Sequence, residues 1–139
     1  MTVYVLDTNI ASAIIRGRTP QLQDRLLAMP DDAVLAISVI TQAELLFGLA
    51  KRGHPSGLSK AVHAFLEQVT ILPWTARVAP IYADLRVRCE GAGITLGAMD
   101  MLIVAHAKAA EAVLVSADGV FQKIPNGFAL ENWLSTPGL

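Results

Sequence analysis

The chain has 139 residues, a size typical of one domain, and 53% of them are hydrophobic while only 17% are charged. This composition excludes a disordered chain, which would be polar and highly charged. Eleven basic and twelve acidic residues give a formal net charge of −1, so no strong basic excess indicates nucleic-acid binding. Cys89 is the only cysteine, which excludes an intrachain disulfide and favours a reducing cytoplasm.

Neither a secretory signal nor a membrane span is expected. Asp7 interrupts the first apolar run, and no basic region precedes that run. The longest apolar stretches, such as residues 33–40, are far shorter than the ~20 residues that a helix needs to cross a bilayer. The high hydrophobic content therefore predicts a well-filled core, with a buried partner surface as a further use of apolar residues. Together with the single cysteine, these features lead us to expect a cytoplasmic protein with no membrane partner.

The first part of the chain alternates a strand with two helices. The apolar, β-rich run Val3–Leu6 predicts a buried strand that ends in turn residues. A short helix is expected over Ile10–Arg16, ending at Gly17. A second helix is expected from Pro20, a residue favoured at helix starts, with an apolar face formed by Leu22, Leu26 and Leu27.

The rest of the chain repeats this alternation, which defines the fold class. In chain order we expect a strand at 34–38, helices at 41–51 and 59–68, a strand at 70–72, helices at 75–90 and 96–111, and strands at 113–116 and 128–130. No linker or repeat divides the chain, so residues 1–139 are expected to form a single domain. Alternating strands and helices predict a three-layer α/β/α sandwich around a central, mainly parallel sheet of four to five strands.

Four acidic residues lie where such a sheet would gather them. Asp7 follows the first strand, Glu44 lies one turn into the helix after the second, Asp100 begins the helix before the fourth, and Asp118 follows the fourth. Sites in parallel sheets lie beyond the carboxyl ends of the strands, near a switch in strand order. Clustered carboxylates repel each other unless a counter-charge is present. Mg²⁺ and Mn²⁺ prefer oxygen ligands, so the pattern indicates a candidate cation site.

Each acid also has a purely structural explanation. Asp7 could cap the helix that follows it, and Thr41–Glu44 fits a capping box in which the glutamate only stabilises the start of its helix. Asp100 would complement a helix dipole, and Asp118-Gly119 is an ordinary turn pair. The functional interpretation depends on the four residues being found at one edge of the sheet.

Six segments, taken in order, resemble a known family: Val5–Asn9, Ser38–Leu45, Tyr82–Arg86, Asp100–Ala107, Ser116–Asp118 and Leu130–Trp133. With these segments the chain resembles a PIN-domain protein, and within that family a VapC-type toxin of a bacterial type II toxin–antitoxin pair. The matching segments span nearly the whole chain. A single Asp-Thr-Asn would be weak evidence, whereas all six segments in order are strong evidence for the family.

The resemblance implies a Mg²⁺- or Mn²⁺-dependent endoribonuclease. Its implied catalytic and metal-binding quartet is Asp7, Glu44, Asp100 and Asp118. Asp7 and Asp100 would be the principal metal ligands, and Thr8, Asn9 and Ser116 match supporting polar positions. The implied reaction is an in-line attack of water on an RNA phosphodiester, which leaves a 5′-phosphate and a 3′-hydroxyl. No serine, cysteine or histidine nucleophile is needed.

The sequence departs from many relatives directly after the fourth acid. Those relatives carry a longer polar loop there, whereas Asp118 is followed by the short apolar segment Gly119–Phe121. Because of that difference, the resemblance does not decide whether the site holds a second metal ion. Without the four acids, the chain has eleven basic and eight acidic residues, so the net charge of −1 does not exclude RNA binding. Any phosphate contacts would have to be local. Arg16 and Arg86 are the expected phosphate contacts, and their alternative is ordinary solvated surface charge.

The resemblance also implies partners. A small cognate antitoxin would occlude the site with a segment that folds into a groove, and DNA would be bound only through that antitoxin. Leu45, Leu46 and Leu49 have the helical spacing to line the groove or, alternatively, to pack in the core. The family implies a homodimer, which the sequence itself does not show.

Two other functions stay open. One is a PIN domain that cleaves weakly or not at all and acts as a binding or regulatory module with its antitoxin. The other is a different acidic α/β enzyme such as an aspartyl-phosphate phosphatase, although Asp7-Thr8-Asn9 lacks the second aspartate that such a site needs. His106 is interpreted as a histidine at the helix surface or the edge of the core, and Met99 and Trp133 as packing residues.

Overall fold

The computed structural model describes residues 1–125 and 127–134. Within these residues, five parallel strands form one sheet in the order β3-β2-β1-β4-β5. The strands are β1 (Val3–Leu6), β2 (Val34–Ser38), β3 (Thr70–Leu72), β4 (Val113–Val115) and β5 (Ala129–Glu131). In the register of the central strands, Val5 lies opposite Ala36 on one side and Leu114 on the other.

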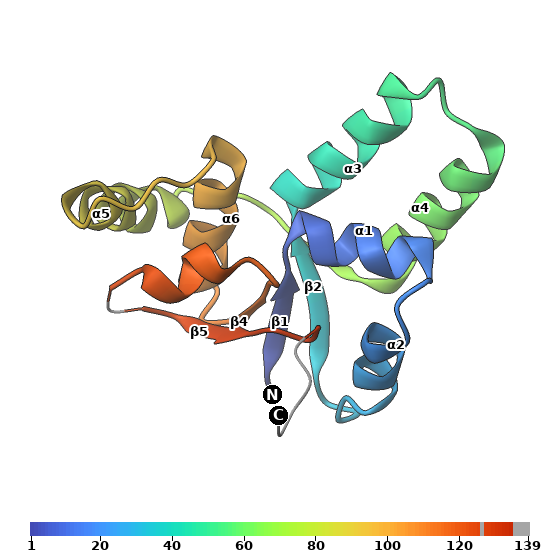
Figure 1. The fold of residues 1–139 in the computed structure, drawn as a ribbon, viewed down its shortest axis with the longest axis horizontal. Helices are drawn as coiled ribbons and strands as arrows, with labels where there is room; N and C mark the ends of the chain where they lie inside the picture. Colours follow the sequence, from blue (N-terminus) through green and yellow to red (C-terminus); the bar gives the residue numbers. More distant parts are fainter. Residues whose placement is uncertain (126, 135–139) are drawn as a thin grey trace.

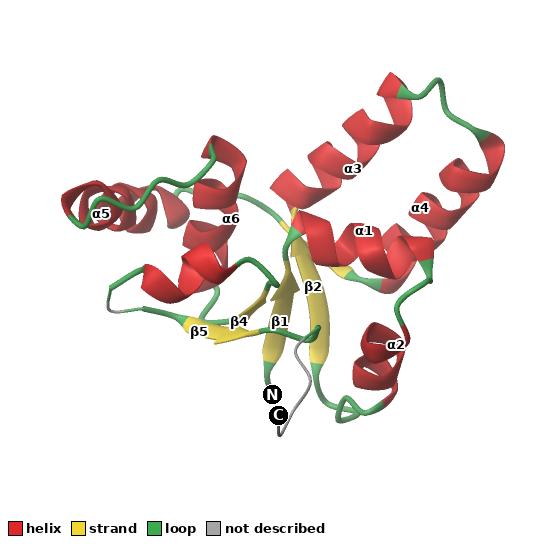
Figure 2. Cartoon of the chain, in the orientation of Figure 1, coloured by secondary structure: helices red, strands yellow, loops and turns green. Residues whose placement is uncertain are grey.

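Helices cover both faces of this sheet, as Figures 1 and 2 show. One face packs against α1 (Thr8–Arg16), α2 (Pro20–Leu27), α3 (Val39–Lys51) and α4 (Ser56–Gln68). The other packs against α5 (Val78–Gly91), α6 (Ala98–Ala109) and the 3₁₀ helix η1 (Gly119–Lys123). The expected three-layer α/β/α fold with a parallel sheet is confirmed.

The alternation of side chains along the strands explains the two cores. Val5 points into the core with α5 and α6, whereas its neighbour Leu6 points into the core with α1 to α4. The same division separates Ala36 from Ile37 in β2, because successive residues of a strand face opposite sides of the sheet. Both faces are buried, which is why these strands are continuous apolar runs.

The helix boundaries differ from expectation in several places. The helix expected from residue 59 begins at Ser56, the one expected from 75 begins at Val78, and the one expected over 96–111 is limited to 98–109. Residues 119–123 form a 3₁₀ helix that the sequence did not predict. Leu27, expected on an apolar face, is 86% exposed, because Leu22 and Leu26 share the helix face that packs on the core and the next residue is turned away from it.

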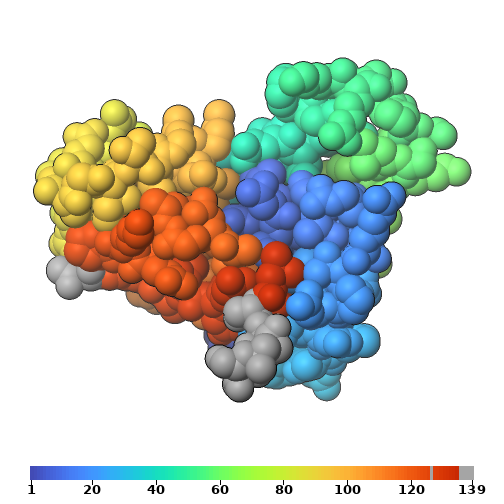
Figure 3. All heavy atoms as spheres, viewed as in Figure 1, coloured from blue at the N-terminus to red at the C-terminus, as the bar shows by residue number. Residues whose placement is uncertain are grey.

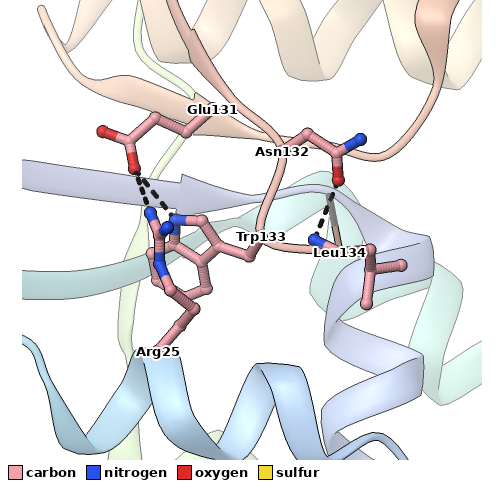
Figure 4. A network of polar contacts seen from close by, with 5 residues as sticks. All are labelled: Arg25, Glu131, Asn132, Trp133 and Leu134. Carbon is pink, nitrogen blue, oxygen red and sulfur yellow. Dashed lines mark hydrogen bonds and ion pairs between the residues drawn. The ribbon is translucent and has the colours of Figure 1, made fainter. Parts of the chain in front are cut away.

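The last described residues are fixed to α2 (Figure 4). Arg25 donates a hydrogen bond to Glu131 Oε1 at 2.9 Å, and the Trp133 indole N–H donates to the same oxygen at 3.0 Å. The Arg25 guanidinium lies over the Trp133 ring, 5.6 Å from its centroid, and Tyr4 contacts that ring from β1. These contacts join the residues after β5 to the sheet and to α2.

Over residues 1–125 and 127–134, none of the helices combines the length and the apolar character that crossing a bilayer requires.

Candidate acidic active site

The strand order reverses at β1, which makes the carboxyl edge of the sheet the place to look for a site. The chain leaves β1 toward β2 on one side, and β4 returns to the other side of β1. Ligands of open α/β sheets bind in the crevice outside such a switch point. Figure 3 shows the surface hollowed above this edge, between α6 and α3, with the start of α1 at the bottom of the hollow.

Asp7 lies at the centre of this edge, between β1 and α1. Its backbone N–H donates to the Val115 carbonyl at 3.0 Å, which extends the pairing with β4 by one residue. Its carboxylate accepts a hydrogen bond from the Ile10 N–H at 2.8 Å and so caps α1. The predicted cap is therefore present, and the residue is only 4% exposed. Oδ1 of Asp7 accepts the capping hydrogen bond, and the carboxylate lies at the carboxyl edge of the sheet.

Glu44 does not form the capping box that the sequence suggested. The helix α3 begins at Val39 and is capped by Ser38, whose hydroxyl accepts from the Ile40 N–H at 3.0 Å. Thr41 therefore lies inside the helix, where it is buried. Its hydroxyl is 3.1 Å from that of Thr8, which donates to Glu44 Oε1 at 2.5 Å. The glutamate is fixed by α1 rather than by its own helix start.

Asp100 and Asp118 approach from the other side of β1. Asp100 lies in the first turn of α6, where its charge complements the helix dipole, and it is partly buried. Asp118 is exposed and caps η1 by accepting from the Val120 N–H at 3.0 Å. The apolar segment after Asp118 is thus a 3₁₀ helix whose Phe121 is buried in the core. The four acids come from four separate segments of the chain.

The charges of the four carboxylates act on one another. Burial raises the pKa of Asp7, and the charges of Asp118 and Glu44 raise it further, against hydrogen bonds from Ser116 and Ile10 that lower it. Burial also raises the pKa of Asp100, and the charges of the other three acids add to this effect. Like charges held together in this way favour a proton or a cation between them.

The donor set fits a hard divalent cation. All the side chains at this edge offer oxygen, from four carboxylates and from the hydroxyls of Thr8 and Ser116. Among residues 1–125 and 127–134, no three acidic, histidine or cysteine side chains lie close enough together to enclose a cation by themselves. Mg²⁺ commonly binds one or two carboxylates and keeps several waters, so an open cluster of this kind suits it.

The other predicted site residues differ in their burial and in their contacts. Ser116 is buried directly after β4, where its hydroxyl lowers the pKa of Asp7 and accepts a hydrogen bond from the Asp118 N–H. Arg16 lines a pocket that includes Thr8 and Glu44. Asn9 is exposed on the first turn of α1.

Arg86 is bound to side chains of its own helix, α5. Its guanidinium donates to the Tyr82 hydroxyl at 3.0 Å and to Glu90 at 3.1 Å, both on its own helix. Its neighbours form a separate hollow between α5 and the segment before α6.

Sequence reasoning missed two polar residues behind the acids. Thr41, assigned to a helix cap, is fully buried and joins Thr8. His106, predicted at the helix surface or at the edge of the core, is buried and has partners on both ring nitrogens, which excludes the first alternative. A polar residue within a strongly apolar helical run was the available signal, because buried polar groups need partners. Met99, expected to pack, is 49% exposed.

A three-layer sandwich with acidic residues at the switch point defines a class of α/β proteins with a candidate cation-dependent site. The PIN-domain family model matches residues 4–127. Ribonuclease VapC2 of Rickettsia felis is 33% identical over 132 residues, covering 94% of this chain and 98% of the relative. Toxin FitB of Neisseria gonorrhoeae is 37% identical over 117 residues, 76% of this chain and 81% of that protein.

The solved structures agree with this assignment. The structure of VapBC2 from Rickettsia felis, bound to a DNA fragment from their promoter, contains a chain with a TM-score of 0.88 and 32% identity. The match covers 95% of this chain and 99% of that chain. The chain belongs to the PIN-domain family and, within it, to the VapC-type proteins.

Proposed function

We propose that this protein is the toxin of a toxin–antitoxin pair and acts as a metal-dependent endoribonuclease. The observation that carries the proposal is the meeting of Asp7, Glu44, Asp100 and Asp118 at one edge of the sheet, where their charges act on each other. The similarity to a ribonuclease VapC2 over nearly the full length of both chains supports the same activity.

In this proposal the four acids hold Mg²⁺ or Mn²⁺, with Asp7 and Asp100 as the principal ligands. Such a cation, when bound, makes water a better nucleophile at neutral pH and offsets the charge of the phosphate. Thr8 orients Glu44 by hydrogen bonding to one of its oxygens, and Ser116 orients Asp7. The site is partly buried, which strengthens the attraction between the carboxylates and the cation.

The pocket beside Glu44 suits both the RNA and the antitoxin. It lies between α1, α3 and α4 and is lined by apolar residues together with the cations Arg16 and Arg52. Leu45 and Leu49 are buried and line it, so they serve the core and the groove together. We propose that a tail of the antitoxin occupies this groove and covers the acids. A symmetric dimer of the toxin, and DNA binding through the antitoxin alone, belong to the same proposal.

The direct test is cleavage of total cellular RNA by the purified protein with Mg²⁺, with Mn²⁺ and with EDTA. We expect discrete fragments with 5′-phosphate ends that disappear with EDTA and with the double substitution Asp7→Ala, Asp100→Ala. The matched control is Asp84→Ala, which removes an exposed carboxylate on α5 that pairs with Arg88. Equal cleavage by the double variant and the wild type would contradict the proposal.

The same variants separate the nuclease from a binding module. If the protein acts only by binding, expression of Asp7→Ala would inhibit growth as strongly as the wild type. If cleavage causes the toxicity, Asp7→Ala would relieve the inhibition while the purified variant still binds its antitoxin.

A further inference from the structure

The helix that carries Asp100 also carries a buried histidine that the acidic site does not include. His106 follows Asp100 by six residues on α6 and is only 4% exposed. Its Nδ1 lies 2.6 Å from the Ser38 hydroxyl and its Nε2 lies 3.1 Å from the Pro73 carbonyl oxygen. The Trp74 ring contacts the imidazole edge-on, with ring centroids 5.4 Å apart. Both nitrogens are therefore used, in a closely packed environment.

These contacts define one tautomer. A carbonyl oxygen only accepts, so Nε2 of His106 carries the hydrogen and donates it to Pro73. A neutral imidazole then has a lone pair on Nδ1, which accepts the Ser38 hydroxyl hydrogen. The Ser38 oxygen in turn accepts from the Ile40 N–H as the cap of α3. A directed chain of hydrogen bonds runs from the start of α3 through α6 to the end of β3.

Two members of this chain of bonds lie next to helices that carry two of the acids. Ser38 caps the helix that carries Glu44, and the His106 helix carries Asp100. We propose that neutral His106 is a positioning residue that fixes α3 and α6 relative to each other and so sets the distance between Glu44 and Asp100. This inference rests on the proposed nuclease function of the acids, which it deepens.

A protonated imidazole cannot serve this role. With hydrogens on both nitrogens, Nδ1 would donate toward Ser38, and the serine hydroxyl hydrogen would lose its acceptor. The groups that contact the ring are Ser38 from β2 and Pro73 and Trp74 from the segment after β3, and Arg77 lines the same hollow as His106. Arg77 is the charged residue among these groups. Burial also lowers the pKa of His106 below its usual value.

The test compares three substitutions at this position in steady-state cleavage of one RNA. His106→Asn keeps an acceptor near the Nδ1 position for Ser38, His106→Gln keeps a donor for Pro73, and His106→Phe keeps only the ring. We expect kcat to fall roughly 10- to 100-fold in His106→Phe, with KM nearly unchanged, because small misplacements of catalytic groups have effects of this size. His106→Asn should recover most of the loss, since it keeps the link to α3.

A matched control separates positioning from simple loss of stability. Val104→Ala removes a fully buried side chain from the same helix without touching the hydrogen bonds. If its melting temperature falls as far as that of His106→Phe while kcat is kept, instability does not explain the loss of rate. A similar loss of kcat in Val104→Ala, or full activity in folded His106→Phe, would overturn the inference. Absence of cleavage by the wild type would instead contradict the proposed function.

Two further measurements address the protonation state. Imidazole ¹⁵N shifts should show the hydrogen on Nε2 of His106 at neutral pH, and a hydrogen on Nδ1 would contradict the proposal. The ratio of wild-type to His106→Asn kcat removes the titration of the carboxylates, which both proteins share. We expect that ratio to fall as the pH falls through the lowered pKa of His106, and a constant ratio would argue against a neutral positioning histidine.

Discussion

At the scale of single residues, Glu44 shows how the structure changes the interpretation of a motif. The Thr41–Glu44 spacing predicted a capping box, yet the cap is Ser38, and Glu44 accepts a hydrogen bond from Thr8 instead. The four sequence positions of the acids and the edge they share could be predicted, because strand ends are visible in the sequence. The partners of Glu44 could not, since Thr8 and Thr41 meet only after two helices pack.

Glu44→Gln separates charge from hydrogen bonding. The glutamine side-chain oxygen still accepts from Thr8, so we expect the melting temperature to stay nearly unchanged. The lost carboxylate charge should weaken metal binding and reduce cleavage at least about tenfold, the size of a single good electrostatic contact. Thermal melts and cleavage rates over a range of Mg²⁺ concentrations measure the two effects. Full activity with an unchanged melting temperature would make Glu44 a structural residue.

Asp100→Asn should stabilise the metal-free protein. Burial and neighbouring charges raise the pKa of Asp100 in the folded state above its unfolded value, so the ionised form opposes folding. The penalty is absent below the unfolded pKa of about 4, grows as the pH rises from there toward the folded pKa, and is complete above the folded pKa. In EDTA at neutral pH we expect a melting temperature a few degrees above that of the wild type, with the difference closing toward pH 4. A difference that grows toward acid pH would contradict this sign.

At the scale of elements, the strands followed the sequence more closely than the helices did. β2 and β3 have the predicted bounds, because both are short apolar runs ended by polar residues or proline. Helix ends depend on which nearby group caps them, and several candidates often compete. Residues 119–123 form a 3₁₀ helix because Asp118 caps them and Phe121 finds a place in the core, neither of which the local sequence determines.

Two glycines should respond in opposite ways to alanine. Gly48 lies inside α3, and an added Cβ would meet nothing within 4 Å, so Gly48→Ala should raise the free energy of unfolding by about 1 kcal/mol. Gly17 ends α1 with a φ of +68°, which an L side chain rarely adopts, so Gly17→Ala should lower it by about 1 kcal/mol. Urea unfolding measures both changes. Destabilisation by Gly48→Ala would show that the glycine is required for the packing of α3 beside the pocket.

At the scale of the whole molecule, the end of the described chain is fixed across the sheet. Trp133 is 2% exposed and connects β1, α2 and the residues after β5 through Tyr4, Arg25 and Glu131. The Arg25–Glu131 pair is about two-fifths exposed and adds little by itself. The buried indole is therefore the main connection.

Trp133→Ala should lower the free energy of unfolding by about 3–5 kcal/mol, the usual effect of removing a buried large aromatic side chain. Trp133→Phe keeps most of the ring contacts but loses the hydrogen bond to Glu131. The lost hydrogen bond should lower the free energy of unfolding by about 1 kcal/mol, in addition to the effect of the smaller ring. Chemical denaturation of the three proteins measures the difference. Equal stability of Trp133→Ala and the wild type would show that the chain end does not contribute to the fold.

The central claim, that the four carboxylates bind a divalent cation, is tested most directly by the melting temperature during a Mn²⁺ titration. A ligand that binds only the folded state stabilises it by about 2.7 kcal/mol at 100 times its Kd. In a chain of this size that is a rise of roughly 10 °C. We expect this rise in the wild type and in Asp84→Asn, and none in the double variant Asp7→Asn, Asp100→Asn, whose asparagine at position 7 keeps the α1 cap. A rise of equal size in the double variant, or no rise in the wild type, would contradict the account.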